Sequence, residues 1–181
     1  KKIVFSGVGK TSLEINYAID SKILLINAES KGEIIEIEKI AKSKKRCVNI
    51  GIRLNPNTDA KTLSQISTGK KENKFGVDEK TFFELINYVK ESKNINLKCL
   101  SVHIGSQILD YKPYKKMLKV LDKVIKRSAY KFEFIDLGGG MGISYENNNK
   151  KLNYSKYNMA IKKFLKNNKS KIIFEPGRSI V

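Results

Sequence analysis

Six short apolar runs that alternate with helix-like segments constrain the fold of this chain more than any other feature. The runs begin at Ile3, Ile23, Val48, Leu97, Phe132 and Ile172. Two intervening segments show apolar residues at the helical spacing i, i+3, i+4 and i+7: Phe82, Leu85, Ile86 and Val89, and Tyr114, Met117, Leu118, Leu121, Val124 and Ile125. This alternation predicts β–α units. Near-continuous apolar strands in such units form a parallel sheet that helices cover.

Two helix starts carry a sequence signature of their own. Thr11 and Ser30 are each followed three residues later by a glutamate, Glu14 and Glu33. In this arrangement, the capping box, the hydroxyl accepts a bond from the later N–H while the glutamate reaches back to the N–H of the cap. The sequence therefore predicts two helices that begin after Thr11 and Ser30, each with a complete capping box.

Polar residues or glycines gather at the carboxyl end of every apolar run. They are Ser6 and Gly7, Asn27 and Glu29, Arg53 and Asn55, His103 and Ser106, Asp136 with the glycines after it, and Glu175 and Arg178. In a closed (β/α)8 barrel these ends meet at one mouth, where the active site lies. An open doubly wound sheet offers only a crevice at its switch point and would not need such groups on every strand. We therefore predict an α/β fold of the (β/α)8 TIM-barrel class.

The chain contains six apolar runs rather than eight, so the predicted barrel is incomplete. Barrels commonly bind a phosphate in the loops after strands seven and eight. If the triple glycine at 138–140 follows strand seven and the turn at 175–178 follows strand eight, the run at Ile3 is strand three. We therefore expect residues 1–181 to be part of one barrel domain, with about strands 3 to 8 present.

Composition restricts what else the chain could be. Hydrophobic residues make up 40% of the 181, enough for one sizeable core. There is no apolar run of eighteen or more residues and no secretory type of start, so we expect neither a membrane span nor a signal peptide. Cys47 and Cys99 each lie in an apolar strand-like run, which predicts buried, reduced thiols and a cytoplasmic location.

The formal net charge of +18 would by itself point to nucleic acid or an acidic surface. Its distribution favours another interpretation, because lysines recur along almost every segment with glutamates and asparagines among them. The sequence shows no recognition helix, zinc module or interleaved basic and aromatic stripe. The charge indicates a solvated, lysine-rich surface, and a weak, sequence-independent nucleic-acid binder remains as an alternative.

Two glycine-containing turns form the main candidate site. The triple glycine at 138–140 follows a buried strand, and glycine there allows the backbone to present its N–H groups to an anion. One unit later, residues 175–178 read Glu-Pro-Gly-Arg: Pro176 stiffens the exit, Gly177 permits a close approach, and Arg178 offers a forked cation suited to phosphate or carboxylate. Because barrels place these two loops side by side, the pair predicts a phosphate site. The alternative is a tight turn with a surface salt bridge.

Two further side chains are candidates for chemistry. His103 is the only histidine in the sequence, so a site built from several histidines is excluded. Because it lies at the end of its strand, its imidazole could stack on a flat cofactor or titrate near neutrality. The alternative is a purely structural role. Arg53 alternates with apolar neighbours, which directs it to the same face of its strand as Asn55. If that face is the barrel interior, the guanidinium needs an anionic or polar partner, which a bound cofactor would supply.

Taken together, the motifs resemble the barrel domain of the pyridoxal-phosphate-dependent decarboxylases with the alanine-racemase-like fold, class 2 of the ornithine, lysine and arginine decarboxylases. The segments are FSGVGKT (5–11), RLNPN (53–57), ISTGKKENKFG (66–76), HIGSQ (103–107), DLGGGMG (136–142) and EPGRS (175–179). They occur in the family's order over essentially the whole chain. HIGSQ with ISTG and ENKFG is more similar to the diaminopimelate branch of the family than to the ornithine or arginine branches.

The resemblance implies a role for each candidate residue toward pyridoxal phosphate. His103 would stack on the pyridine ring. Glu175 would face the ring nitrogen and favour its protonated form, which draws electrons from the carbanion formed as carbon dioxide leaves. Arg53 would lie near the ring or its phenolic oxygen, and Arg178 would also meet a substrate carboxylate. The residues around the phosphate would be Ser106, Gly138, Gly139, Gly140, Gly177 and Arg178, with Pro176 in the same turn.

For the intact protein, the resemblance implies a homodimer that converts meso-diaminopimelate to L-lysine and carbon dioxide in lysine biosynthesis. In the family, the Schiff-base lysine lies on a strand upstream of this chain's start, and a downstream β-domain completes the site. Lys2 precedes the wrong strand, so we expect residues 1–181 to be inactive alone. The alternatives are a decarboxylase of ornithine or arginine, and a non-catalytic remnant of the same scaffold. Neither a metal nor a membrane is expected as a partner.

Overall fold

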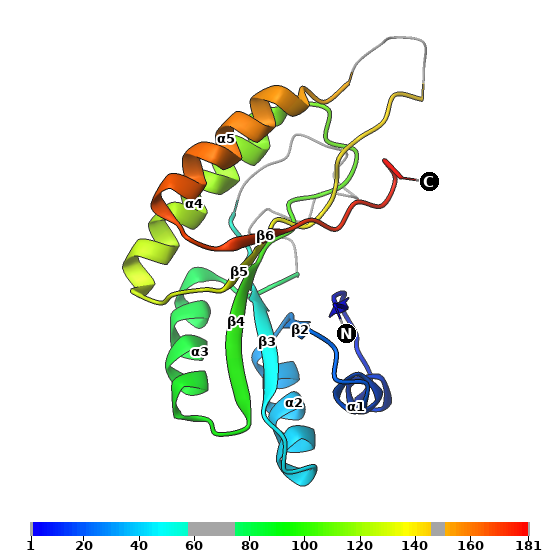
Figure 1. The fold of residues 1–181 in the computed structure, drawn as a ribbon, viewed down its shortest axis with the longest axis vertical. Coiled ribbons are helices and arrows are strands. Elements are labelled where there is room, and N and C mark those ends of the chain that lie inside the picture. Colours follow the sequence, from blue (N-terminus) through cyan, green and yellow to red (C-terminus); the bar gives the residue numbers. More distant parts are fainter. Residues whose placement is uncertain (1, 58–74, 146–150, 181) are drawn as a thin grey trace. The chain divides into compact units, whose positions relative to one another are not determined.

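A computed structural model describes residues 2–57, 75–145 and 151–180 of the chain. It divides into two compact units, and we describe each by itself (Figure 1). Unit 1 comprises Lys1–Leu54 and Phe75–Ser101, and unit 2 comprises Asn55–Lys74 and Val102–Val181. Most of the predicted motif at 66–76 lies outside the described residues.

Unit 1 is a parallel sheet with helices packed on it. Its elements are β1 (Val4–Phe5), α1 (Ser12–Asp20), β2 (Leu25–Ala28), α2 (Lys31–Ser43), β3 (Val48–Arg53), α3 (Glu79–Glu91) and β4 (Ile95–Ser101). Strands β1 to β4 pair in parallel in the order of the sequence, and the register between β2 and β3 places Ala28 beside Ile52. Helix α2 contacts β2 and β4, and α3 contacts β4 (Figure 1). This register aligns the carboxyl ends of β2 and β3.

Unit 2 repeats the same β–α pattern in its own elements. These are α4 (Tyr111–Ser128), β5 (Phe134–Asp136), α5 (Tyr154–Asn167) and β6 (Lys171–Ile173). The strands β5 and β6 pair in parallel with Ile135 beside Ile172, and α4 packs against α5 (Figure 1). The predicted alternation of strands and helices is therefore confirmed in both units.

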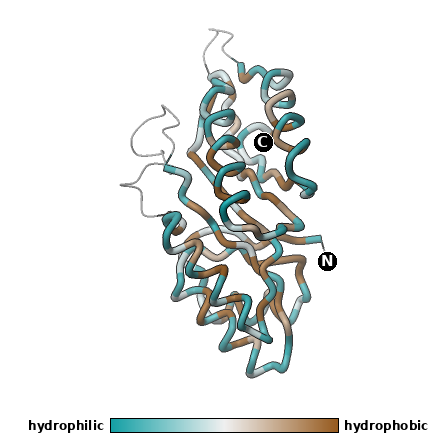
Figure 2. The backbone as a smooth tube through the Cα atoms, turned by 90° about the vertical axis from the view of Figure 1, so that its left-hand side faces the viewer, coloured by the Kyte–Doolittle hydropathy of each residue, from teal (hydrophilic) through white to brown (hydrophobic). Residues whose placement is uncertain are grey.

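The helical periodicity has the consequence predicted for it. In α3 the buried residues are Phe82, Leu85, Ile86 and Val89, and in α4 they include Tyr114, Met117, Leu118, Leu121 and Val124. All four residues of β2 are buried. Figure 2 shows hydrophobic residues along the strands and along one side of the helices. The helices therefore bury their apolar faces, as amphipathic helices in a packed fold do.

The two predicted helix caps differ in the structure. At Thr11 the capping box is complete, because the hydroxyl accepts from the N–H of Glu14 and the Glu14 carboxylate accepts from the N–H of Thr11 at 2.8 Å. At Ser30 only the hydroxyl half forms, with a bond from the N–H of Glu33. The Glu33 carboxylate instead accepts from the N–H of Glu29 at 2.6 Å. The prediction of a second complete box was wrong, since this carboxylate has other partners.

The two cysteines also differ from each other. Both are free, and Cys99 is buried in β4 as predicted, whereas Cys47 is exposed. Cys47 precedes β3 by one residue, so it lies in the connection to that strand rather than within it. The prediction that Cys47 is buried was therefore wrong. Among the described residues, no helix is long and apolar enough to cross a membrane, and no group of three or more metal-binding side chains occurs.

Candidate functional site

The triple-glycine turn follows β5 after one residue, Leu137, and is held by close backbone contacts. Gly138 and Gly140 have φ of 64° and 83°, in the left-handed region that favours glycine. The N–H of Gly138 donates to the buried Asp136 carboxylate at 2.9 Å. A Cβ on Gly139 would lie 2.1 Å from the carbonyl oxygen of Glu175. The turn therefore needs glycine both for its conformation and for the close approach of the next loop.

His103 lies against this turn. The N–H of Gly139 donates to Nδ1 of His103 at 3.3 Å, so this nitrogen is the unprotonated acceptor and any proton on the neutral ring is on Nε2. The N–H of Glu175 donates to the carbonyl oxygen of Gly138 at 3.0 Å. Unit 2 thus brings three of the predicted site segments together: the segment at His103, the triple glycine and the turn after β6.

Several donors near these segments have no acceptor within the part of the chain that the structure describes. Among the described residues, the N–H groups of Gly140, Gly177 and Arg178 have none, and the Ser106 hydroxyl has no hydrogen-bond partner. By contrast, the N–H groups of the first two glycines of the turn are already used. Unpaired backbone donors at a glycine-rich turn suit an acceptor-only group such as a phosphate. The residues present therefore fit a phosphorylated cofactor.

Arg178 is held by an aromatic neighbour that the sequence did not identify. Its guanidinium lies 5.5 Å from the ring centroid of Tyr145 and donates to the Tyr145 hydroxyl. Both side chains belong to unit 2, and both are exposed. A guanidinium stacked in this way keeps its planar fork available to a second partner.

A buried tyrosine, Tyr114, stabilises the triple-glycine turn through a hydrogen bond. The Tyr114 hydroxyl donates to the carbonyl oxygen of Gly139 at 3.2 Å, and its ring stacks on Tyr157 with centroids 4.4 Å apart. Burial raises the pKa of both Tyr114 and Tyr157, so both phenols are neutral. In the sequence Tyr114 was only one member of an apolar helical stripe. The one sequence signal for this contact is the Tyr114 hydroxyl itself, since a buried phenol usually has a hydrogen-bond partner.

Arg53, the remaining candidate, belongs to unit 1. Its NH1 donates to the Glu29 carboxylate at 2.7 Å, and its guanidinium lies 5.7 Å from the ring centroid of Phe75. The two charged side chains are 12% and 9% exposed. The anionic partner that the sequence argument required is therefore Glu29 in this structure, a residue that was noted at its strand end but not assigned to the site.

A second buried cation of unit 1 lies next to this pair. Lys10, with a side chain 1% exposed, contacts Glu33 Oε1 at 3.0 Å. Its Nζ also donates to the carbonyl oxygens of Gly7 at 2.5 Å and Asn27 at 2.7 Å. An amino group that makes three polar contacts is held in place. Lys10 therefore ties β1, β2 and α2 together and is not an available nucleophile.

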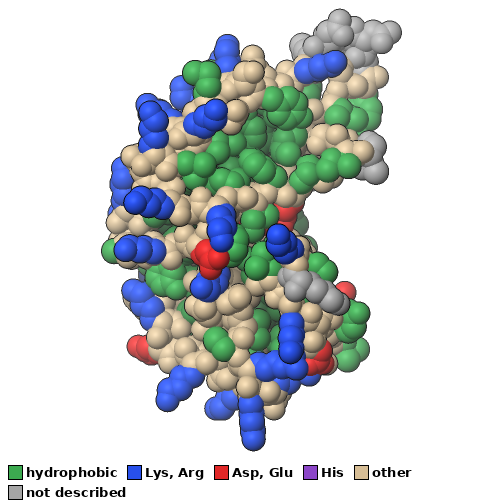
Figure 3. Space-filling view, in the orientation of Figure 1, with side chains coloured by type: hydrophobic (Ala, Val, Ile, Leu, Met, Phe, Trp, Pro, Cys, Tyr) green, Lys and Arg blue, Asp and Glu red, His purple; other side chains and the backbone are tan. Residues whose placement is uncertain are grey.

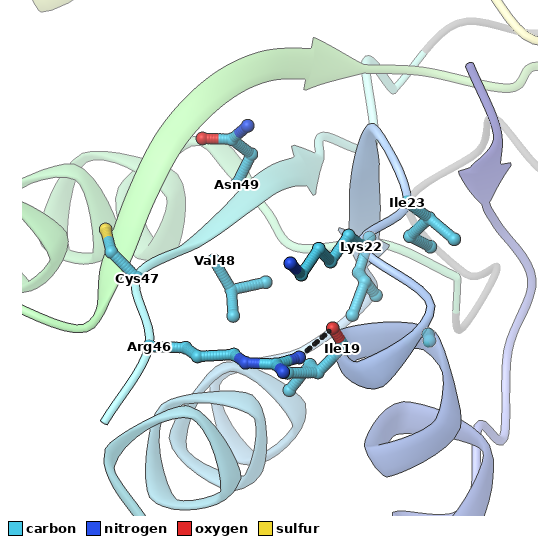
Figure 4. Close-up of a pocket in the computed structure, with 9 residues that line it drawn as sticks. Ile19, Lys22, Ile23, Arg46, Cys47, Val48 and Asn49 are labelled. Atoms are coloured by element: carbon cyan, nitrogen blue, oxygen red, sulfur yellow. Dashed lines mark hydrogen bonds between the residues drawn. The ribbon is translucent and has the colours of Figure 1, made fainter. Parts of the chain in front are cut away.

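Unit 1 also contains a cavity of about 390 Å³ at the amino ends of β2 and β3 (Figure 4). Its lining includes Lys22, Arg46 and the exposed Cys47. Arg46 donates to the carbonyl oxygen of Ile19 at 2.8 Å, a bond drawn in Figure 4, and also contacts Asp20. The guanidinium thus holds the end of α1, and none of the predicted site residues lines this cavity.

Lysine and arginine side chains are scattered singly and in small groups over the face shown in Figure 3. Several form ion pairs on the surface, for example Lys44 with Asp20 and Lys126 with Asp122, both at 2.8 Å. Lys44 lowers the pKa of Asp20, and Lys126 lowers that of Asp122.

Three kinds of comparison place the chain among known proteins. The family model described as "Pyridoxal-dependent decarboxylase, pyridoxal binding domain" matches residues 1–181. The diaminopimelate decarboxylase of Helicobacter pylori strain J99 is 45% identical over 183 residues, which cover 99% of this chain and 45% of that protein. That of Aquifex aeolicus is 38% identical, over 100% of this chain and 44% of that protein. The chain thus spans about half the length of the curated relatives it matches.

Solved structures of diaminopimelate decarboxylases have a fold similar to that of this chain. The crystal structure of diaminopimelate decarboxylase from Helicobacter pylori in complex with L-lysine matches with a TM-score of 0.93 and 43% identity, over 99% of this chain and 46% of that one. Together with the parallel β–α units, this similarity confirms the prediction of an α/β fold of the incomplete (β/α)8-barrel type.

Proposed function

We infer the function from one premise, that this chain belongs to the pyridoxal-dependent decarboxylases through their pyridoxal-binding domain. The cofactor of this family is pyridoxal phosphate. We propose that the full-length protein is a diaminopimelate decarboxylase, which converts meso-diaminopimelate to L-lysine and carbon dioxide. The identity of 45% to a diaminopimelate decarboxylase over 99% of the chain carries this proposal.

Unit 2 supplies the residues for binding the cofactor. The N–H groups of Gly140, Gly177 and Arg178 and the Ser106 hydroxyl, which have no partner among the described residues, would bind the phosphate, because its ionised oxygens accept hydrogen bonds and donate none. The Arg178 guanidinium adds a positive charge. The imidazole of His103, oriented by its bond from Gly139, provides a flat surface for the ring. Gly138 and Gly139 hold the shape of the turn rather than bind directly.

When bound, pyridoxal phosphate supplies the electron sink that takes up the electron pair released as carbon dioxide leaves. Glu175 would favour a proton at the ring nitrogen, because a carboxylate beside that nitrogen favours its charged form. Arg178 orients the substrate carboxylate through its planar fork. We also propose that Arg53 acts on the bound cofactor.

Cofactor binding and turnover by the full-length protein test this assignment. We expect bound pyridoxal phosphate in the absorption spectrum and release of carbon dioxide from meso-diaminopimelate. Ornithine and arginine serve as matched competitors. A preference for either of them contradicts the substrate assignment, and a protein that does not bind the cofactor contradicts the proposal as a whole.

The role of Glu175 has a test of its own. In the full-length protein, Glu175→Ala should lower turnover by at least tenfold more than it lowers the affinity for the cofactor, because the carboxylate acts on the ring nitrogen during the reaction. Glu133→Ala, which removes an exposed carboxylate paired with Lys171, is the matched control and should change neither quantity. Equal losses of turnover and affinity would contradict the role of Glu175.

We further propose that the full-length protein is a cytoplasmic homodimer. The free thiols of Cys47 and Cys99 suit a reducing compartment. The resemblance described above implies a homodimer. Sedimentation equilibrium of the full-length protein measures its mass in solution, and a monomer with full activity contradicts the dimer.

A further inference from the structure

The ion pair between Glu29 and Arg53 is formed across two neighbouring strands. The parallel register places Ala28 of β2 beside Ile52 of β3. Glu29 directly follows β2 and Arg53 is the last residue of β3, so the register brings these two residues near each other. Oε1 of Glu29 accepts from NH1 of Arg53 at 2.7 Å. The contact therefore follows from the register of the sheet.

Arg53 is the sole partner of the Glu29 side chain within the described part of the chain. The carboxylate is about nine-tenths buried, since its side chain is 9% exposed. Its second oxygen, Oε2, is buried and has no hydrogen-bond partner among the described residues. All the polar contact that this carboxylate makes is thus directed at one guanidinium.

The backbone that carries Glu29 is fixed by further buried charges. Oε2 of Glu33 accepts from the N–H of Glu29 at 2.6 Å, while Oε1 of Glu33 pairs with Lys10 at 3.0 Å. The ammonium of Lys10 also binds the carbonyl oxygen of Asn27, two residues before Glu29. The Glu33 carboxylate therefore binds Lys10 and the N–H of Glu29 instead of completing the capping box predicted at Ser30. The contacts that Lys10 and Glu33 make therefore restrict the backbone position of Glu29.

The guanidinium itself is held from two sides. Glu29 holds NH1, and the ring of Phe75 lies 5.7 Å from the guanidinium carbon. Since a guanidinium carries five N–H donors and stacks on aromatic faces, this arrangement fixes its plane and leaves other donors for an acceptor group. A buried ion pair of this kind is a weak source of stability, because desolvation offsets most of the attraction. The main physical effect of the pair is that Glu29 orients the Arg53 guanidinium and balances its positive charge.

We propose that Glu29 is a positioning residue for Arg53 in the cofactor site, and that the buried pair of Lys10 and Glu33 fixes Glu29 for that task. The inference rests on the proposed function, because it assumes that Arg53 acts on the bound cofactor. Glu29 does not touch the reacting atoms. It sets the orientation of the guanidinium and balances its charge.

A double-mutant cycle in the full-length protein tests this coupling. Glu29→Ala should lower kcat about tenfold to a hundredfold, as the loss of an orienting partner typically does, with a smaller change in KM. In an Arg53→Ala background the same substitution should change kcat by less than about twofold, since there is no guanidinium left to orient. Glu29→Gln keeps an acceptor oxygen toward Arg53 and should retain more activity than Glu29→Ala. Asp20→Asn, at an exposed pair with Lys44, is the control and should match the wild type.

Thermal unfolding of the cofactor-free protein provides a readout independent of activity. Arg53→Ala should lower Tm more than Glu29→Ala/Arg53→Ala, because the single variant leaves a buried carboxylate without a partner. Additive effects on kcat, unchanged kcat in Glu29→Ala, or equal losses in Glu29→Gln and Glu29→Ala would each overturn the proposal. If the wild-type protein binds cofactor but turns over none of the amino acids, the proposed function fails, while the Tm cycle still decides whether Glu29 and Arg53 are coupled.

Discussion

The carboxyl ends of the strands carry polar groups in both units, but the two units use these groups differently. In unit 1 the charged side chains pair with one another, Lys10 with Glu33 and Glu29 with Arg53. In unit 2 the described structure leaves donors without acceptors, the N–H groups of Gly140, Gly177 and Arg178 and the Ser106 hydroxyl.

This difference indicates a division of labour. Charged side chains that pair with each other hold unit 1 in one arrangement without a ligand, whereas open backbone donors become satisfied only when water or a ligand accepts from them. Unit 2 should therefore gain more from cofactor binding than unit 1, because a ligand stabilises the conformation that binds it. Four sets of substitutions test the comparison.

Gly139→Ala should have the largest effect, because it removes the turn on which the open donors of unit 2 depend. A Cβ there would meet the Glu175 carbonyl oxygen at 2.1 Å. The backbone must shift, and we expect a loss of about 3 kcal/mol or more in the free energy of unfolding of the full-length protein, measured by chemical denaturation. Gly177→Ala is the control, since its Cβ would meet nothing within 4 Å, and should cost less than about 0.5 kcal/mol. Equal effects would contradict this account of the turn.

Arg53→Ala tests the paired charges of unit 1. It should lower the free energy of unfolding by about 3 kcal/mol, because it leaves the Glu29 carboxylate buried and unpaired. Glu29→Ala/Arg53→Ala should recover part of that loss. Chemical denaturation of the cofactor-free protein measures both. A double variant that is less stable than Arg53→Ala would contradict the claim that the Glu29 carboxylate destabilises the fold when Arg53 is absent.

The stacked tyrosines behind the triple glycine form a matched pair. Tyr114→Phe removes the donor to the Gly139 carbonyl oxygen and should cost about 1 kcal/mol. The Tyr157 hydroxyl is buried and has no partner among the described residues, so Tyr157→Phe should be neutral or stabilising. Thermal unfolding compares the two variants. A larger loss for Tyr157→Phe would show that the support of the turn is assigned to the wrong ring.

The smallest effect is expected at the start of α3 in unit 1. The Asp78 carboxylate accepts from the N–H of Thr81 at 2.7 Å, and this bond lowers the pKa of Asp78. Because the folded pKa lies below the unfolded one of about 3.9, the stabilisation is fully present above that pH and disappears as the pH falls through the folded value. Asp78→Ala should therefore cost about 1 kcal/mol at pH 7 and less in acid. Asp78→Asn, which keeps a capping oxygen, should cost less at pH 7. A loss for Asp78→Ala that does not change with pH would exclude a role for the charge.

Local patterns predicted much of the fold because their causes are local. The buried stripes of α3 and α4 follow from a period of 3.6 residues, and the complete capping box at Thr11 involves residues three apart. The same rule failed at Ser30, where Glu33 binds Lys10 and the N–H of Glu29 instead of its own cap. Burial of Cys47 was also predicted wrongly, because an apolar run in the sequence does not show where the strand begins.

For the candidate site, the sequence by itself determined which residue types stand at the strand ends: the triple glycine, the Glu-Pro-Gly-Arg turn, His103 and Arg53. The tertiary structure alone decided their partners. Glu29 meets Arg53 because of the register between β2 and β3, and Tyr114 reaches Gly139 because α4 packs beside the turn. Contacts between residues more than twenty positions apart depend on strand register and helix packing, which arise from the whole fold and leave no signature in either segment.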